Sequence, residues 1–445
     1  MSRSLFSIAS LLLGSAFLFF AGGLTGMLLP VRGGIEGFSS FNLGLLGTGW
    51  AVGYVSGCLL VPQLVSRVGH IRAFSVMAAM ACISVMMSSL FILPYAWIIL
   101  RALAGFAFAG AAMIVEGWLV ERSEAKSRGM IFGTYTMVNL FASTAGQMVI
   151  AIGTPETFQL FTVAAIFYVV ALLPTALTKT QAPAPLARAE LNINRLWKNS
   201  PVAVVAVLLT GISNGSFGTL VAVYGHDIGL SVSGVAFFVS ASILAGAAAQ
   251  IPIGFLSDLI DRRMVVILIA LVAIGSDSMF VTHAPTTTSI AVIYSAIFGA
   301  AIYSFYPVLV AHANDHADPS EGLQTSSGLL LLMGCGTMIG PLLGGVLMST
   351  QGPTGLFVST TIAHIGILLF TIWRITQRVA VETDDKGQFV PIAPMRTRTP
   401  QTILLSDGEI AEEESSDDYE GESLNGENLA SDTASSDKES EAEKQ

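Results

Sequence analysis

The sequence predicts an all-α integral membrane protein with twelve transmembrane helices, arranged as two pseudo-symmetric bundles of six. Of its 445 residues, 53% are hydrophobic and only 12% are charged, whereas about 25% are charged in an ordinary soluble domain. Apolar runs of roughly 20 residues, the length that crosses a bilayer, follow one another along the chain. Six of these runs precede a polar segment and six follow it.

The apolar runs are separated by glycine, proline and charged residues. The first six cover residues 5–29, 45–65, 73–93, 97–120, 130–152 and 158–176. The second six cover residues 202–224, 235–256, 264–282, 289–311, 329–348 and 355–373. The first run is longer than the apolar region of a signal peptide, so we interpret it as an uncleaved first helix.

These runs divide the chain into four parts. We expect an N-terminal six-helix bundle at residues 1–176, a central cytoplasmic loop at 177–201, a C-terminal six-helix bundle at 202–376 and a disordered tail at 377–445. The tail contains 18 Asp and Glu but only 6 Lys and Arg, a composition typical of disorder.

Lysine and arginine predict the orientation, because cytoplasmic loops are enriched in both. If the N-terminus is inside, the inner loops and the N-terminus carry twelve Lys or Arg, and the outer loops carry Arg32 alone. Both termini are then cytoplasmic. The body has no basic face for nucleic acid, no cysteine spacing typical of a metal site and no phosphate-binding loop. We therefore expect no nucleic-acid partner, metal, cofactor or enzymatic activity.

An internal repeat relates the two halves at an offset of 192 to 194 residues. One pair of loop residues and two pairs of glycines within spans correspond. The pairs are Ser66 with Asp258, Gly105 with Gly299, and Gly146 with Gly340. Two like halves of six spans are typical of one class of transporters with parallel repeats.

Three motifs give the chain a resemblance to the major facilitator superfamily. They are Gly254-x3-Asp258-x2-Asp261-Arg262-Arg263, Leu100-Arg101-x3-Gly105 and Gly336-x3-Gly340-Pro341-x2-Gly344-Gly345. The strings 116–122 and 311–315 also resemble the bacterial YcaD-like branch. The resemblance implies a monomeric secondary active transporter that moves a small organic solute across the bacterial inner membrane by alternating access, with protons as the candidate coupling ion.

An alternative function is a membrane sensor or scaffold on the same fold, which signals through the acidic tail and transports nothing. Polar residues in spans of both halves favour transport, because a scaffold does not need them.

The loop motif supplies the candidate gating residues. Asp258 beside Arg262 and Arg263 can form contacts at the cytoplasmic mouth that break as the mouth opens. The equivalent loop of the first half is degenerate and retains Arg67 and Gly69. The alternative is a plain positively charged membrane anchor.

Arg101 is the first candidate for substrate binding. It lies about five residues into its span, where a charge facing lipid is costly. A role as anion or substrate contact competes with a simpler one, in which its side chain snorkels to the outer surface.

Four further residues are candidates for substrate contact. Asn139 and Asn214 fall near mid-depth, and Tyr303 and Tyr306 share one face of a continuous helix. For these residues the alternatives are interhelical hydrogen bonding and packing in the core. Glu116 and Asp277 are the candidates for proton coupling. For Glu116 the alternative is a solvated helix end, and Asp277 lies on a helix that the resemblance places at the periphery.

Overall fold

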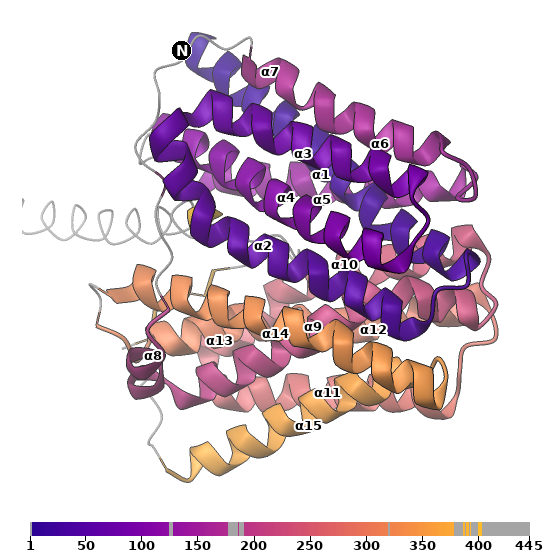
Figure 1. Cartoon of the computed structure of the whole chain (residues 1–445). Helices are drawn as coiled ribbons and strands as arrows, with labels where there is room; N and C mark the ends of the chain where they lie inside the picture. Colours follow the sequence, from indigo (N-terminus) through magenta and orange to yellow (C-terminus); the bar gives the residue numbers. More distant parts are fainter. Residues whose placement is uncertain are drawn as a thin grey trace, which may run out of the picture.

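The computed structural model describes residues 2–123, 128–176, 186, 191–318, 321–377, 386–387, 389–390, 392 and 399–402. Over these ranges the chain is helical and contains no strand. Helices from the first half of the chain gather in the upper part of Figure 1, and helices from the second half gather in the lower part.

The helices follow the predicted spans closely. The first half contains α1 (Ser2–Ile35), α2 (Ser40–Val68), α3 (His70–Leu90), α4 (Pro94–Arg122), α5 (Arg128–Met148), η2 (Val149–Ala151), α6 (Gln159–Val170) and α7 (Leu172–Ala176). The second half contains α8 (Ile193–Asn199), α9 (Pro201–Asp227), α10 (Val232–Leu259), α11 (Arg262–Thr282), α12 (Thr288–Ile302), α13 (Phe305–Asn314), α14 (Gly322–Gln351) and α15 (Gly355–Ile375).

Ten helices of the described chain are long and apolar enough to cross a membrane. One of the ten is the pair α12 and α13, taken together as Thr288–Asn314. The predicted fifth span is occupied by α5 and η2, which are not among the ten, and the sixth falls on the shorter apolar stretch Gln159–Pro174. All-helical membrane architecture is therefore confirmed, with ten of the twelve expected spans.

A break at Tyr303 and Ser304 separates α12 from α13. Pro307 follows four residues after Tyr303, and proline has no N–H to donate to that carbonyl. The side-chain amide of Gln250 in α10 donates to the Tyr303 carbonyl instead, at 3.3 Å. The proline thus explains the break, and a neighbouring helix supplies the missing donor.

Glycines let paired helices touch backbone to backbone. A Cβ added at Gly105 in α4 would collide with the Trp50 carbonyl of α2. In the second half, a Cβ at Gly299 in α12 would collide with the Ser242 carbonyl of α10. Trp50 and Ser242 are 192 positions apart, and Gly105 and Gly299 are 194 positions apart. These offsets are those of the internal repeat, so the two halves pack their helices in an equivalent way.

A second pair of contacts repeats in the same way. Gly146 in α5 lies against the Phe20 carbonyl of α1, and Gly340 in α14 lies against the Ile212 carbonyl of α9. Small residues are typical of helix interfaces in membranes, where close approach replaces a hydrophobic driving force.

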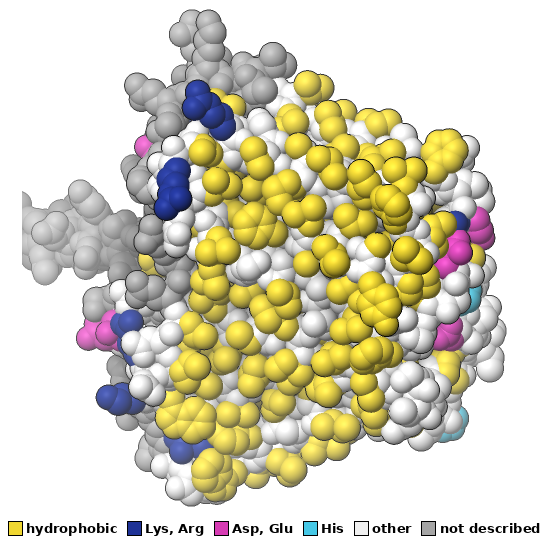
Figure 2. Space-filling view, in the orientation of Figure 1, with side chains coloured by type: hydrophobic (Ala, Val, Ile, Leu, Met, Phe, Trp, Pro, Cys, Tyr) yellow, Lys and Arg dark blue, Asp and Glu magenta, His cyan; other side chains and the backbone are white. Residues whose placement is uncertain are grey.

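The two ends of the molecule differ in charge. Most Lys and Arg side chains visible in Figure 2 lie along the left edge, and an apolar belt covers the middle. We call this edge the basic end; α2, α4 and α10 finish there, and α3, α9 and α11 begin there. At the opposite end α2 packs against α14, where Thr48 donates a hydrogen bond to the Met338 carbonyl at 2.8 Å.

Gly105→Ala should lower the free energy of unfolding by about 1–3 kcal/mol, because the added methyl overpacks the contact with Trp50. Thermal unfolding of purified protein measures the effect. Gly275→Ala in α11 is the matched control, since nothing lies within 4 Å of a Cβ at that position. Equal melting temperatures for the two variants would contradict the packing argument.

Candidate functional site

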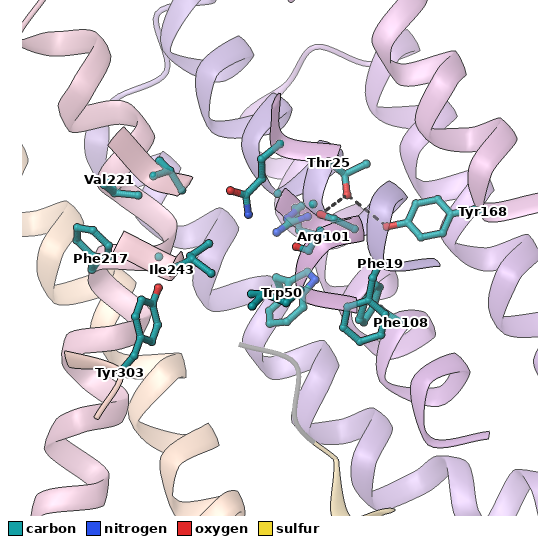
Figure 3. A pocket seen from close by; sticks show the side chains of 18 residues that line it. Phe19, Thr25, Trp50, Arg101, Phe108, Tyr168, Phe217, Val221, Ile243 and Tyr303 are labelled. Carbon is teal, nitrogen blue, oxygen red and sulfur yellow. Dashed lines mark hydrogen bonds between the residues drawn. The ribbon is translucent and has the colours of Figure 1, made fainter. Parts of the chain in front are cut away.

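A cavity of about 120 Å³ lies between helices of both halves, with room for several water molecules. Figure 3 shows its two walls: Phe19, Trp50 and Arg101 belong to the first half, and Phe217, Ile243 and Tyr303 to the second. The walls are largely aromatic and apolar, with a few polar groups between them. Such a lining is typical of sites for small organic molecules.

Arg101 supplies the positive charge of this cavity. Its side chain is 9% exposed, and its guanidinium carbon lies 5.9 Å from the centre of the Trp50 ring, a cation–π contact. Thr25 and Tyr168 line the same wall, with their hydroxyl oxygens 3.3 Å apart. No carboxylate is among the described residues that line the cavity. Arg101 therefore lines an internal cavity.

A second cavity, of about 50 Å³, adjoins the first. Trp50 and Tyr303 line both and so separate them. Asn214 lines the second cavity, and its side-chain oxygen is buried without a hydrogen-bond donor among the described atoms. Tyr303 therefore lines both cavities, and Asn214 lines the second.

Asn139 and Tyr306 line neither cavity. Asn139 is fully buried and accepts a hydrogen bond from Ser15 of α1 at 2.9 Å, which joins α5 to α1. Tyr306 is 2% exposed and belongs to the core of the second half. For these two residues the structure favours the packing alternatives.

Asp277 lies in a buried network of the second half. His364 of α15 meets one of its carboxylate oxygens at 2.7 Å, and Thr360 donates to the other at 2.7 Å. The second ring nitrogen of His364 lies 2.8 Å from the Ser213 hydroxyl of α9. Asp277 and His364 are fully buried, so this network ties together α11, α15 and α9.

The loop motif at the basic end holds two arginines in place. Arg262 is 1% exposed and pairs with Asp315 at 2.8 Å, while Asp258 lies 3.4 Å away and is 43% exposed. Arg263 pairs with Asp261 at 2.8 Å. The principal partner of Arg262 is therefore Asp315, after α13, whereas the loop motif suggested Asp258.

Burial and charge compete at these two carboxylates. Burial acts to raise the pKa of Asp261, but the hydrogen bonds from Arg263 hold that pKa below its usual range. At Asp315 burial prevails, and its pKa is raised despite the charge of Arg262.

The corresponding loop of the first half is simpler. Gly69 adopts a φ of +85°, a conformation that favours glycine, and its N–H caps α2 by donating to the Val65 carbonyl at 2.8 Å. Arg67 is exposed at the end of α2.

Glu116 is a buried carboxylate rather than a solvated helix end, since it is 1% exposed. The Tyr135 hydroxyl donates to it at 2.7 Å, and the hydroxyl of Thr402 donates at 3.0 Å. Thr399 also donates to it. Burying a carboxylate inside a helical membrane protein costs free energy. Such a residue is therefore a candidate for function.

Several residues of these sites escaped the sequence analysis. Trp50, Gln147 and Tyr168 all line the first cavity, but they stand in apolar runs without a distinguishing neighbour. Asp315 is the last residue of the string 311–315, which resembles the YcaD-like branch. That resemblance is the one feature of the sequence that points to Asp315. His364 also stands in an apolar run, and Thr399 lies in a segment expected to be disordered.

With this geometry described, the family can be identified. A family model described as Major Facilitator Superfamily matches residues 11–231 and 203–408. The chain therefore belongs to the Major Facilitator Superfamily of membrane transporters. The family and the apolar helices make it a multi-pass inner-membrane protein.

Relatives place it in the YcaD-like branch. The "Uncharacterized MFS-type transporter YcaD" of Escherichia fergusonii is 25% identical over 354 residues, which cover 78% of this chain and 90% of the relative. The protein of the same name from Salmonella typhi is 24% identical, covering 82% and 95%.

Solved structures share the fold. The nucleoside transporter NupG matches with a TM-score of 0.68 at 13% identity, over 83% of this chain and 98% of that one. A bacterial homologue of the lysosomal transporter Spinster, inward-facing and occupied, matches with a TM-score of 0.68 at 16% identity, over 86% and 98%.

His364→Ala should lower the free energy of unfolding by about 3 kcal/mol or more, because it leaves the Asp277 carboxylate buried without its main partner. Chemical or thermal unfolding in detergent measures the loss. His226→Ala is the control, since His226 pairs with the neighbouring Asp227 at an exposed helix end. A His364 variant as stable as the control would mean that the network contributes nothing to the fold.

Proposed function

We propose that this protein is a secondary active transporter that carries a small organic solute by alternating access. In this proposal its twelve spans form two six-helix bundles, and the solute binds between them in the central cavity. The monomer is the functional unit. The sensor or scaffold alternative is not favoured, since both the family and its solved structural neighbours are transporters.

The observation that carries the proposal is the cavity itself. It is lined by residues of both halves, and Arg101 is buried in its wall. A cation beside Trp50, with apolar rings opposite, suits a solute that combines a negative or electron-rich group with an apolar body. Asn214 and Tyr303 extend the site into the second cavity.

We assign the basic end to the cytoplasm, with both chain termini on that side. Among the described residues, Arg67, Arg72, Arg122, Arg195 and Lys198 lie at this end, as the positive-inside rule requires. Arg32, bonded to the Pro155 carbonyl, marks the outer end.

The gate in this proposal is the charge cluster at the basic end. Arg262 lies between the carboxylates of Asp258 and Asp315 and can change partner as the mouth opens. Arg263 is held by Asp261, and Arg67 with Gly69 forms the counterpart in the first half. Two arrangements with different contacts are what alternating access needs.

Proton coupling is assigned to two buried carboxylates. Glu116 lies on α4, the helix that also carries Arg101, so a change in its charge can reach the cavity through one element. Asp277 is the second candidate and is bound to His364 outside the central cavity.

The general test is a comparison of metabolites in cells with and without the protein, followed by uptake or export of the altered compound in vesicles. A compound that crosses only with the protein present supports transport. No protein-dependent flux of any altered compound would favour a role without transport.

Arg101→Ala should reduce flux at least tenfold while membrane levels persist, because the cavity loses its cation. Arg101→Lys should recover little, since an ammonium cannot reproduce the planar guanidinium. Arg72→Ala, at an exposed arginine, is the control and should transport normally. Normal flux in Arg101→Ala would remove Arg101 from the binding site.

Glu116→Gln should abolish the response of flux to an imposed pH gradient, because the amide binds no proton at physiological pH. Vesicles containing a pH-sensitive dye measure proton movement driven by substrate. Glu121→Gln changes an exposed carboxylate five residues on and should behave as wild type. Unaltered proton movement in Glu116→Gln would shift the assignment to Asp277.

A further inference from the structure

The chain places part of its own C-terminal tail in the basic end of the body. Residues 386, 387, 389, 390, 392 and 399–402 are described in the structure, and their contacts are with helices of both halves. In Figure 1 short yellow stretches of the tail lie at the left-hand ends of the helices. This contact includes Arg262 and Asp315 of the proposed gate, whereas none of the described tail residues lines the central cavity.

The second half binds the segment through a buried amide. The Gln250 side chain donates to the Ile392 carbonyl at 2.7 Å, and its oxygen accepts from the Ile392 N–H at 2.8 Å. Gln250 is 2% exposed. A side-chain amide that donates to the carbonyl and accepts from the N–H of the same residue recognises extended backbone. This recognition does not depend on the side chain of that residue.

Two apolar side chains of the segment add to this contact. Phe389 and Ile392 pack against the core of the second half. The Phe389 ring lies over Gly254, where any Cβ would collide with it. The first glycine of the loop motif thus leaves the space that Phe389 fills.

Charged groups hold the beginning of the segment. The Gly387 N–H donates to Asp315 at 3.1 Å, and the Gly387 carbonyl accepts from Arg262. Lys386 donates to the Ile260 carbonyl at 2.8 Å. The segment 386–402 contains three basic residues and no acidic one, so its charge opposes that of Asp315 and Glu116.

The first half binds the other end of the segment. Thr399 and Thr402 both donate hydrogen bonds to Glu116, and Thr399 is itself fully buried. The described residues of the tail therefore contact Gln250 in α10 and Glu116 in α4, one helix from each half.

We propose that the basic end is a binding site for a basic peptide segment, that the C-terminal tail of this chain is its occupant through residues 386, 387, 389, 392 and 399–402, and that the bound tail keeps this end from closing. A peptide bound to both halves at this end must leave before the two halves can approach each other there. Docking thereby arrests the transporter in one state, and release frees it. The docking itself does not depend on the proposed function, whereas the arrest does.

Spin-label distances in the full-length chain test the docking. One label is placed at Ile71, exposed at the start of α3, and the other at Val390, with the three native cysteines replaced. A docked segment should give one narrow distance distribution. Thr399→Glu, which sets a second carboxylate against Glu116, should broaden it, since residues freed beyond Gln377 explore about 20 Å.

A second variant changes the body instead of the tail. Gly254→Val fills the space of Phe389 and should also broaden the distribution. Thr376→Glu at the exposed end of α15 and Gly275→Val in open space of α11 are the matched controls and should leave it narrow. A broad distribution in the otherwise unchanged chain would overturn the docking.

A second label pair tests the arrest. Ile71 and Leu259 are exposed at the basic end in opposite halves. In Thr399→Glu, part of the population should shift to a shorter distance than in the unchanged chain. If the tail is released and this distance does not change, the proposed arrest is overturned, even if the first label pair shows that the tail docks in the unchanged chain. Failure to transport any solute would count against the proposed function, and with it the arrest of a transporter, while the docking would stand.

Discussion

Backbone contact at glycine is the constraint on which the rest of the molecule depends. The hydrophobic effect does not drive helices together within lipid, so close packing must hold them together. Gly105 lies one turn from Arg101 and touches the backbone of Trp50. The contact that joins α4 to α2 therefore also brings the arginine and the tryptophan together in the cavity wall.

Buried charge is the second constraint. A carboxylate or guanidinium within the helices needs partners, and each of the three cases here finds them differently. Asp277 uses a histidine and a threonine of α15, and Arg262 uses an aspartate beyond α13. Glu116 uses the hydroxyl of Tyr135 in α5 together with hydroxyls from the tail. The first arrangement joins helices within one half, and the last joins segments 283 residues apart.

The sequence predicts the features that depend on local composition. Apolar runs locate the helices, and a lone charge in such a run identifies Arg101. Contacts between residues far apart in the chain cannot be predicted in this way. Nothing in the sequence around Asp315 indicates its pairing with Arg262, and nothing around Thr399 indicates its hydrogen bond to Glu116. Tyr303 and Tyr306 show a third cause. Their shared face assumes a continuous helix, but the break before Pro307 turns Tyr303 toward the cavities and Tyr306 into the core.

The order of synthesis gives the tail contact a further meaning. Glu116 leaves the ribosome long before Thr399, and chains assemble from their N-terminal parts first. While α9 to α15 are being inserted, the Glu116 carboxylate therefore has the hydroxyl of Tyr135 in α5 as a partner but not yet those of Thr399 and Thr402. The last helix ends at Ile375, so the contact of Thr399 and Thr402 with Glu116 can form only after every helix has been synthesised.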